Sequence, residues 1–299
     1  MVRTARERRL RFVTQTGFFL LFLVAPPLDL FRLDLEAGHF FFLGVPWTLG
    51  FDPWLAGAIS TETAVLRLVV RGFLPVLGVV GLFLFVSWRW GRLYCGWLCP
   101  HFAVVEVIND LMEVARGAPT LWESPASRRR GSLVGALFLG VGVAGFALVW
   151  AVALLTYLLP PLEVYGNLLN GTLTRNQGLF LGVATLVLAL DFALARHLFC
   201  RFGCAVGFFQ SLAWMANRRA LVVGFDRRLA EACVSCPQAA CERVCPMRLV
   251  PRGGRRRLAT CTQCSRCLRA CALVQPPGRD PPLTWRVAGE GSFPSRSKG

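Results

Sequence analysis

Long uncharged apolar runs alternate with arginine-rich segments along the chain. A helix needs about 20 mainly apolar residues to cross a bilayer. By this criterion the runs predict four transmembrane helices, at residues 12–30, 64–88, 133–160 and 179–197. A further apolar stretch, residues 39–59, contains Pro46, Asp52 and several glycines, and we expect it to be an interfacial or re-entrant segment.

The distribution of arginine orients these helices. Residues 1–16 hold five arginines and residues 88–132 hold six, whereas residues 160–178 hold one. Because loops rich in Lys and Arg stay in the cytoplasm, both termini are expected there, in a multi-pass protein of the bacterial inner membrane. A cleaved signal peptide over residues 1–28 is the alternative, but no small-x-small site follows it cleanly, which favours an uncleaved anchor.

Composition and charge support a membrane protein. Hydrophobic residues make up 55% of the 299 positions and charged residues 17%, against about 25% charged in soluble domains. The net charge of +16 at pH 7 could indicate nucleic acid as a partner. The arginines flank apolar runs instead of forming one stripe, so we expect them to set topology and expect no nucleic-acid binding.

The twelve cysteines fall into four groups, and none is left over. They are Cys95 and Cys99; Cys200 and Cys204; Cys233, Cys236, Cys241 and Cys245; and Cys261, Cys264, Cys267 and Cys271. Every group lies in a segment expected in the cytoplasm or at the cytoplasmic membrane edge. Reducing conditions there disfavour structural disulfides, so metal binding or redox chemistry is expected.

The last two groups have the spacing of iron–sulfur ligands. The second quartet, CTQCSRCLRAC, matches the C-x2-C-x2-C-x3-C motif of bacterial-type [4Fe–4S] ferredoxins. The first, CVSCPQAACERVCP, has four residues in its middle gap and Pro246 after its last cysteine, whereas Ala272 stands where the second quartet would have proline. Two structural zinc sites are the alternative, but zinc modules usually set two C-x2-C pairs about 12–20 residues apart.

In two-cluster ferredoxins the fourth cysteine of each motif ligates the other cluster. We therefore expect two [4Fe–4S] clusters with crossed ligands. The first would be held by Cys233, Cys236, Cys241 and Cys271, and the second by Cys261, Cys264, Cys267 and Cys245. The expected organisation is a mainly α-helical membrane domain (residues 1–220), a C-terminal cytoplasmic double-cluster ferredoxin domain (221–275) and a disordered tail (276–299).

The two remaining pairs share a C-x3-C spacing at membrane edges. Cysteines four residues apart on a helix lie on one face and can chelate one metal. Two thiolates form a soft site that suits Cu(I), with His101 or His197 as a further candidate ligand. Alternatively, the four cysteines meet in one site, act as a dithiol/disulfide couple, or are simply small buried hydrophobic residues.

These motifs together resemble the membrane-bound polyferredoxin family. The stretches GRLYCGWLCPHF and HLFCRFGCAVGFFQ, followed by LVVGFD and the two quartets, are most similar to the accessory protein of cbb3-type cytochrome c oxidase assembly (the CcoG, FixG or RdxA type). The NapH- and NosR-type electron carriers are related. Ala205 departs from the C-x3-C-P pattern of the second motif, and the extra β-sandwich domain of the oxidase accessory branch is not seen.

The resemblance implies an iron–sulfur electron-transfer protein that reduces Cu(II) to Cu(I) for oxidase assembly. Cys95, Cys99, Cys200 and Cys204 would carry out this step, with electrons from a cytoplasmic donor. Copper-delivery or oxidase-assembly proteins would be partners. One alternative is a NapH- or NosR-like relay that takes electrons from quinol to a partner reductase, with a quinone site at the membrane edge. The other is a non-catalytic redox sensor or scaffold.

Overall fold

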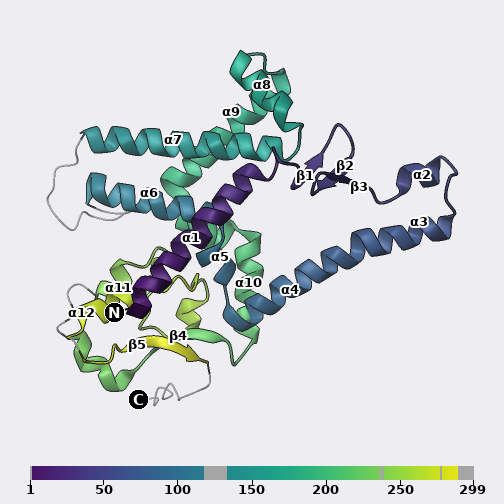
Figure 1. Ribbon diagram of the computed structural model, residues 1–299. Helices are drawn as coiled ribbons and strands as arrows, with labels where there is room; N and C mark the ends of the chain where they lie inside the picture. The colour runs from purple at the N-terminus through teal and green to yellow at the C-terminus, as the bar shows by residue number, and fades with distance from the viewer. Residues whose placement is uncertain (1, 118–132, 235, 237–238, 277, 289–299) are drawn as a thin grey trace. The chain divides into compact units, whose positions relative to one another are not determined.

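The computed structural model describes residues 2–117, 133–234, 236, 239–276 and 278–288. The chain is mainly helical (Figure 1), as the sequence predicts. The longer helices are α1 (Val2–Val24), α3 (Thr61–Leu68), α4 (Leu74–Trp90), α6 (Pro100–Arg116), α7 (Leu133–Thr156), α8 (Pro161–Asn170), α9 (Arg175–Leu190), α10 (Ala205–Ala216) and α12 (Arg266–Val274). The short ones are α2 (Phe51–Leu55), α5 (Leu93–Trp97) and α11 (Ala240–Arg243), with π-helical turns η1 (Val69–Phe73), η2 (Asp191–Ala195) and η3 (Phe199–Gly203) and 3-10 turns η4 (Arg227–Cys233) and η6 (Arg255–Leu258).

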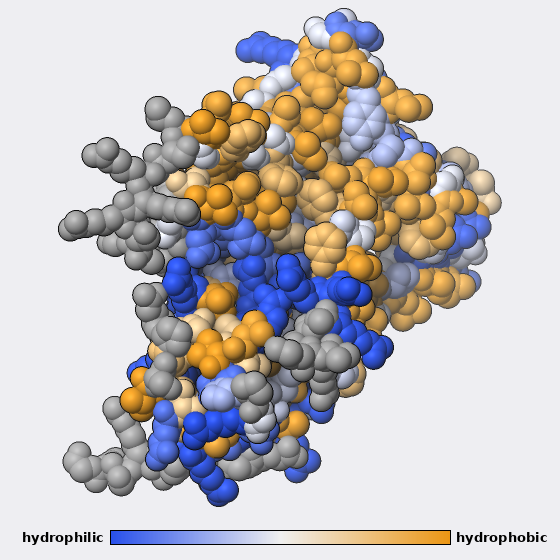
Figure 2. All heavy atoms as spheres, turned by 60° about the vertical axis from the view of Figure 1, so that its left-hand side comes forward, coloured by the Kyte–Doolittle hydropathy of each residue, from blue (hydrophilic) through white to orange (hydrophobic). Residues whose placement is uncertain are grey.

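In the described part of the chain, three helical segments are long and apolar enough to cross a membrane. They are Thr61–Trp90, Val134–Thr156 and Arg175–Ala195. These segments correspond to the predicted spans at residues 64–88, 133–160 and 179–197. Many of their apolar side chains are exposed, Leu77 and Phe138 among them, and broad apolar areas are visible on the surface in Figure 2. Such surfaces are compatible with contact with lipid.

The first predicted span falls on α1, which is not among these three segments. Arg and Glu are frequent in its residues 2–11, so the apolar part covers only residues 12–24. Thirteen helical residues extend ~20 Å at 1.5 Å per residue, whereas the hydrocarbon core is about 30 Å thick. Pro26 and Pro27 follow the helix and cannot continue its hydrogen bonding. A fourth span therefore stays a prediction.

The chain divides into two compact units. Unit 1 comprises Met1–Gln15, Leu82–Ala103 and Arg196–Gly299, and unit 2 comprises Thr16–Gly81 and Val104–Ala195. This division differs from the boundary at residue 220 expected from the sequence, because both C-x3-C motifs share a unit with the ferredoxin quartets. All twelve cysteines lie in unit 1.

Unit 2 is built on the packing of α7 against α9, which lie side by side in Figure 1. In its core, the rings of Phe19 and Phe22 lie 5.9 and 4.3 Å from that of Trp150. The stretch at residues 39–59, expected to be interfacial or re-entrant, contains two strands and α2 (Phe51–Leu55), and its place at the membrane stays a prediction. Strands β1 (Phe31–Asp34), β2 (His39–Phe42) and β3 (Val45–Trp47) form an antiparallel sheet in that order.

Unit 1 contains the second sheet, in which β4 (Leu221–Phe225) pairs antiparallel with β5 (Leu283–Val287). Strand β5 lies in the segment expected to be a disordered tail, which corrects that expectation for these residues. Burial of Leu283 in the core, where its side chain is 2% exposed, stabilises the strand. The hydrogen bond from Ala288 N–H to the Ala220 carbonyl oxygen extends the pairing of the two strands. Residues 289–299 of the expected tail lie outside the described residues.

Candidate iron–sulfur and thiolate sites

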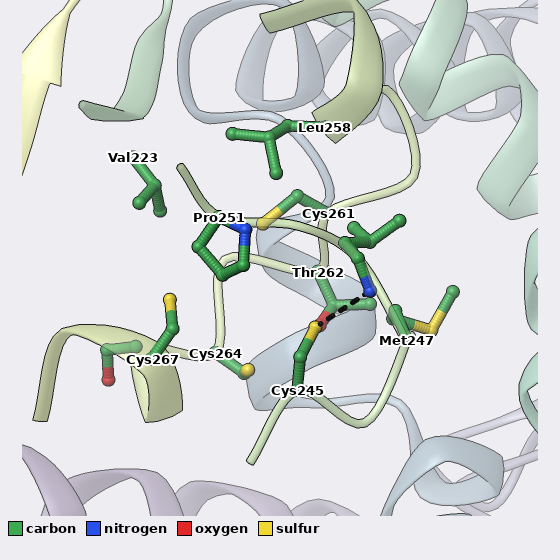
Figure 3. Close-up of a pocket in the computed structure, with 11 residues that line it drawn as sticks. Val223, Cys245, Met247, Pro251, Leu258, Cys261, Thr262, Cys264 and Cys267 are labelled. Carbon is green, nitrogen blue, oxygen red and sulfur yellow. Dashed lines mark hydrogen bonds between the residues drawn. The ribbon is translucent and has the colours of Figure 1, made fainter. Parts of the chain in front are cut away.

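Four cysteines line one pocket of unit 1, and their sulfur atoms surround a common space (Figure 3). These cysteines are Cys261, Cys264, Cys267 and Cys245. Apolar side chains, including Val223 and Leu258, line the pocket between them. The backbone N–H of Leu249 donates to Cys245 Sγ at 3.4 Å, and N–H donors to sulfur are one means by which proteins set cluster potentials.

A second pocket collects the other four ferredoxin cysteines. Its lining includes Cys233, Cys236, Cys241 and Cys271. Arg252 and Leu283 also face this space. The two pockets thus combine three cysteines of one quartet with the last cysteine of the other, which is the crossed grouping expected from the sequence.

Left-handed backbone positions shape both ligand loops. Gln263 and Ser265 have φ values of 57° and 58° between the cysteines of the second quartet, and Ala239 has a φ of 48° in the first. Non-glycine residues pay on the order of 1–3 kcal/mol for such conformations, which cluster at ligand-binding sites. The turns fold the chain back on itself, so successive thiols can face one enclosed space.

Burial dominates the acid–base properties of these thiols. It raises the pKa of Cys261 to about 12 and that of Cys241 to about 11, and it also raises the pKa of Cys267. At pH 7 these three thiols are therefore neutral when no metal is bound. A bound metal requires the thiolate, so ligation releases the protons and couples metal binding to folding of this region.

The arrangement of the thiols suits a cluster better than a zinc ion. Thiolates bound to zinc sit about 2.3 Å from one shared ion. No three His, Cys, Asp or Glu side chains of the described residues are placed to share one ion, whereas each ligand of a cubane binds a different iron atom. The residues fit [4Fe–4S] clusters.

The two C-x3-C motifs are built alike. In each, the second cysteine precedes the first residue of a helix, α6 after Cys99 and α10 after Cys204. The backbone N–H groups of His101 and Phe102 bond Cys99 Sγ, and that of Gly207 donates to Cys204 Sγ at 3.5 Å. Helix N-termini favour negative charge on the group that caps them, but burial is the larger effect at Cys99 and raises the pKa of its thiol.

The proline of the C-x3-C-P pattern has a structural role at this position. Pro100 is the first residue of α6, where a missing N–H costs nothing and the fixed φ suits the helix. Ala205 is the first residue of α10, and that helix begins at the same place without proline. The departure from the family pattern therefore leaves the local geometry in place.

A buried arginine lies among the C-x3-C cysteines. Arg92 is 2% exposed, and its guanidinium donates to Ser211 Oγ at 2.7 Å and to the Cys200 carbonyl oxygen at 2.8 Å. Burial lowers the pKa of Arg92, and the nearby thiols, Cys95 and Cys204 foremost, raise it. Its charge therefore faces sulfur, and within the described residues no carboxylate forms an ion pair with it.

The first C-x3-C loop packs against the ligand loop of the second quartet. A Cβ atom added to Gly96 would lie 2.0 Å from the Thr262 carbonyl oxygen, so only glycine allows this approach. Trp97 Nε1 donates to the Gln263 carbonyl oxygen at 3.1 Å. The arginine network reaches the same region, because Ser211 Oγ donates to the Ala259 carbonyl oxygen at 2.7 Å.

The structure treats the two candidate histidine ligands differently. His101 Nδ1 lies 3.6 Å from Cys200 Sγ. His197 is buried, and burial is the main cause that lowers its pKa to about 4. The positive charges of Arg248, Arg196 and Arg201 nearby lower this pKa as well. His197 is therefore a neutral imidazole surrounded by cations, and no thiol contact of this side chain is present in the described region.

Sequence reasoning missed two polar residues at the C-x3-C cysteines. Arg92 was counted among the arginines that set topology, and Gln210 was not singled out. Gln210 is fully buried, with its amide oxygen 3.6 Å from Cys95 Sγ. Gln210 lies 115 positions from Cys95 and Ser211 119 from Arg92, so no local pattern connects these residues. The one available signal was a Gln-Ser pair inside an otherwise apolar helix.

Comparison with known proteins supports an iron–sulfur function. A family model described as a 4Fe-4S binding domain matches residues 72–119. The curated "Putative electron transport protein YccM" of Escherichia coli (strain K12) is 25% identical over 236 residues, which cover 75% of this chain and 62% of that protein. The chain thus spans less than two thirds of that relative, and no solved structure matches it.

These findings do not distinguish the oxidase accessory branch from its relatives. They do agree with each other and with the cysteine spacing, since one match concerns a [4Fe–4S] domain and the other electron transport. Together with the apolar helices, they support an iron–sulfur electron-transport function and are consistent with the membrane polyferredoxin family.

Proposed function

We propose that this protein is an inner-membrane electron relay that takes electrons from a cytoplasmic donor and reduces Cu(II) to Cu(I) at the C-x3-C cysteines. Both termini would lie in the cytoplasm, and residues 12–30 would supply a fourth span. The observation that carries the proposal is the packing of the Gly96 loop on Thr262, which brings the C-x3-C region against one ferredoxin pocket.

The cluster ligands would be divided as the pockets divide them. Cys233, Cys236, Cys241 and Cys271 would hold one [4Fe–4S] cluster, and Cys261, Cys264, Cys267 and Cys245 the other. When bound, such clusters supply one-electron carriers whose potentials depend on charge and hydrogen bonds at the sulfurs. The protein's own contribution is to bury the ligands and to position the pocket of Cys261 against the Gly96 loop.

At the membrane edge, thiolates would favour the reduced product. Soft thiolate ligands prefer Cu(I) over Cu(II), and each Cu(II) takes up one electron as the donor is oxidised by one. Copper ions are the substrate in this proposal, and copper-delivery or oxidase-assembly proteins would take the product. His101 could act as a further ligand, since its ring already lies beside Cys200.

Anaerobic copper reduction by the full chain in lipid nanodiscs tests this function. Protein reduced with dithionite and freed of excess reductant should convert added Cu(II) to Cu(I), measured with a Cu(I)-specific chromophoric chelator. The Cys95→Ala/Cys200→Ala variant should lose at least tenfold in rate while it keeps the cluster absorbance of the ferredoxin region. Full copper reduction by that variant would contradict the proposal.

The same preparation separates the alternatives. Rapid reduction of the clusters by a quinol, without copper reduction, would favour the NapH- or NosR-like relay. The exposed Trp88 and Trp90 at the end of α4 fit an aromatic belt at the membrane interface, and they could border a quinone. Failure with both substrates would leave the redox sensor or scaffold.

A further inference from the structure

The C-x3-C cysteines, which lie in two distant segments of the chain, form a single group of sulfurs in unit 1. Cys95 Sγ lies 3.6 Å from Oε1 of Gln210 on α10, the helix that begins after Cys204, and the ring of His101, two residues after Cys99, lies 3.6 Å from Cys200 Sγ. Arg92 also connects the two pairs, because it binds the Cys200 carbonyl oxygen while its charge faces Cys95 and Cys204. The two pairs therefore constitute one site.

Each of these four sulfurs has a hydrogen-bonding group beside it. Backbone N–H groups at two helix N-termini bond Cys99 and Cys204, and the His101 ring lies beside Cys200. The fourth is the amide of Gln210 beside Cys95, and the Nε2 atom of this buried amide has no other partner. A half-turn of the amide places Nε2–H on the sulfur, which would suit a thiolate acceptor. Donors at every sulfur are typical of metal-bound thiolates.

The charge of Arg92 requires an anion in the same place. A buried charge without a counter-charge is strongly unfavourable. Arg92 is 2% exposed, and its hydrogen-bond partners are a hydroxyl and a carbonyl, both uncharged. Four thiolates on a metal centre would provide the missing negative charge, whereas four neutral thiols would not.

The match to a 4Fe-4S binding domain indicates which metal centre this is. The matched residues, 72–119, contain only two cysteines, Cys95 and Cys99, and neither ferredoxin quartet. The similarity to an iron–sulfur domain therefore falls on the first C-x3-C motif itself. The second motif supplies the two further thiolates that a [4Fe–4S] cluster needs.

We infer that Cys95, Cys99, Cys200 and Cys204 hold a third iron–sulfur cluster and that Arg92 is its buried counter-charge. The inference rests on the proposed function for the direction of electron flow, and it adds a further carrier to that relay. The thiolates then belong to a resident one-electron carrier. This changes one element of the proposed function: Cu(II) would take its electron from this carrier at the edge of the site, and the four sulfurs would not themselves ligate copper.

Iron and acid-labile sulfide counts on the full chain, prepared anaerobically, test the inference. Three clusters give about twelve iron and twelve sulfide per chain, and two give about eight. The Cys95→Ala/Cys200→Ala variant should fall from about twelve to about eight, while the electron paramagnetic resonance signals of the two ferredoxin clusters persist and show that unit 1 is folded.

A count of about eight in the wild-type chain overturns the inference, whether or not copper is bound as well. The wild-type count decides the matter even where the double variant fails to fold. Copper reduction is measured separately, so a chain with about twelve iron that leaves Cu(II) unreduced supports the third cluster and contradicts the proposed function.

Discussion

Two kinds of cysteine site lie within unit 1, and they are assembled in different ways. The ferredoxin pockets draw their cysteines from residues 233–271, a short segment of tight loops with left-handed turns. The proposed C-x3-C site draws its cysteines from two segments about a hundred residues apart, each followed by a helix. One kind of site is specified by spacing, and the other by the fold that brings its halves together.

This difference predicts where each site is vulnerable. A local loop fails when one of its cysteines is lost, because a [4Fe–4S] cluster needs four thiolates. The C-x3-C site is a composite site, because its cysteines come from two segments. It also depends on residues that are not ligands, such as Arg92, which binds the Cys200 carbonyl oxygen, and Gly96, which packs against Thr262. Substitutions of ligands and of supporting residues should therefore affect the two kinds of site to different extents.

The largest expected effect is loss of a whole ferredoxin cluster, and it tests the crossed ligation. Cys245→Ala and Cys261→Ala should each remove the same cluster, so these two variants should show the same residual electron paramagnetic resonance signal. Cys271→Ala and Cys233→Ala should both remove the other cluster and should therefore resemble each other. Each should lose about four iron per chain. If Cys245→Ala resembled Cys233→Ala, the ligands would not be crossed.

Loss of the buried arginine should act on the composite site. Arg92→Met removes a positive charge beside four thiolates and should lower the potential of the centre there by at least ~59 mV, a tenfold change in a one-electron equilibrium. Redox titration followed by electron paramagnetic resonance measures the shift, and Arg92→Lys should restore part of it. The control Arg256→Met removes an exposed arginine of the same unit; an equal shift there would argue against a specific role.

Gly96→Ala should separate the C-x3-C loop from the loop of Thr262. The added Cβ would lie 2.0 Å from a backbone oxygen, and overpacking of this kind usually costs about 1–3 kcal/mol. Denaturant unfolding of the full chain measures the loss. Gly254→Ala is the matched control, since nothing lies within 4 Å of its added Cβ. Equal stability of the two variants would mean that the Gly96 contact is not rigid.

The smallest expected effect concerns the helix start of the second motif. Ala205→Pro should be neutral or stabilising by up to about 1 kcal/mol, because the first position of a helix tolerates proline and the change restricts the unfolded chain. Cys204 before it has φ −79° and ψ 109°, an extended conformation that precedes proline well. A loss of iron or of thermal stability in this variant would show that Ala205 N–H is needed.

The sequence anticipated the local features of this protein well. The apolar runs gave three helices long enough to span a bilayer, because such runs need no partner to be recognised. The quartet spacing likewise anticipated which thiols would share a pocket. Strand β5 was missed because Leu283–Val287 lies in a segment rich in proline and glycine, and it forms only by pairing with β4.

The composite site could be anticipated only in part. The identical C-x3-C spacings indicated that the two pairs belong together, but no local pattern indicated that Arg92 would be buried instead of lying at the membrane surface. Its partner Ser211 is 119 positions away, and such contacts depend on the packing of α10. The close approach at Gly96 depends in the same way on a loop that follows 166 positions after Trp97.

The separation of the two C-x3-C motifs has a consequence for biosynthesis. A ribosome adding 5–20 residues per second needs roughly 5–20 s to proceed from Cys99 to Cys204. During that interval the first pair of thiols exists without its counterpart, while residues 134–156 and 175–195, which are apolar enough to cross a membrane, are still being made. The nascent dithiol would then be open to oxidation or to stray metal ions until the second pair follows.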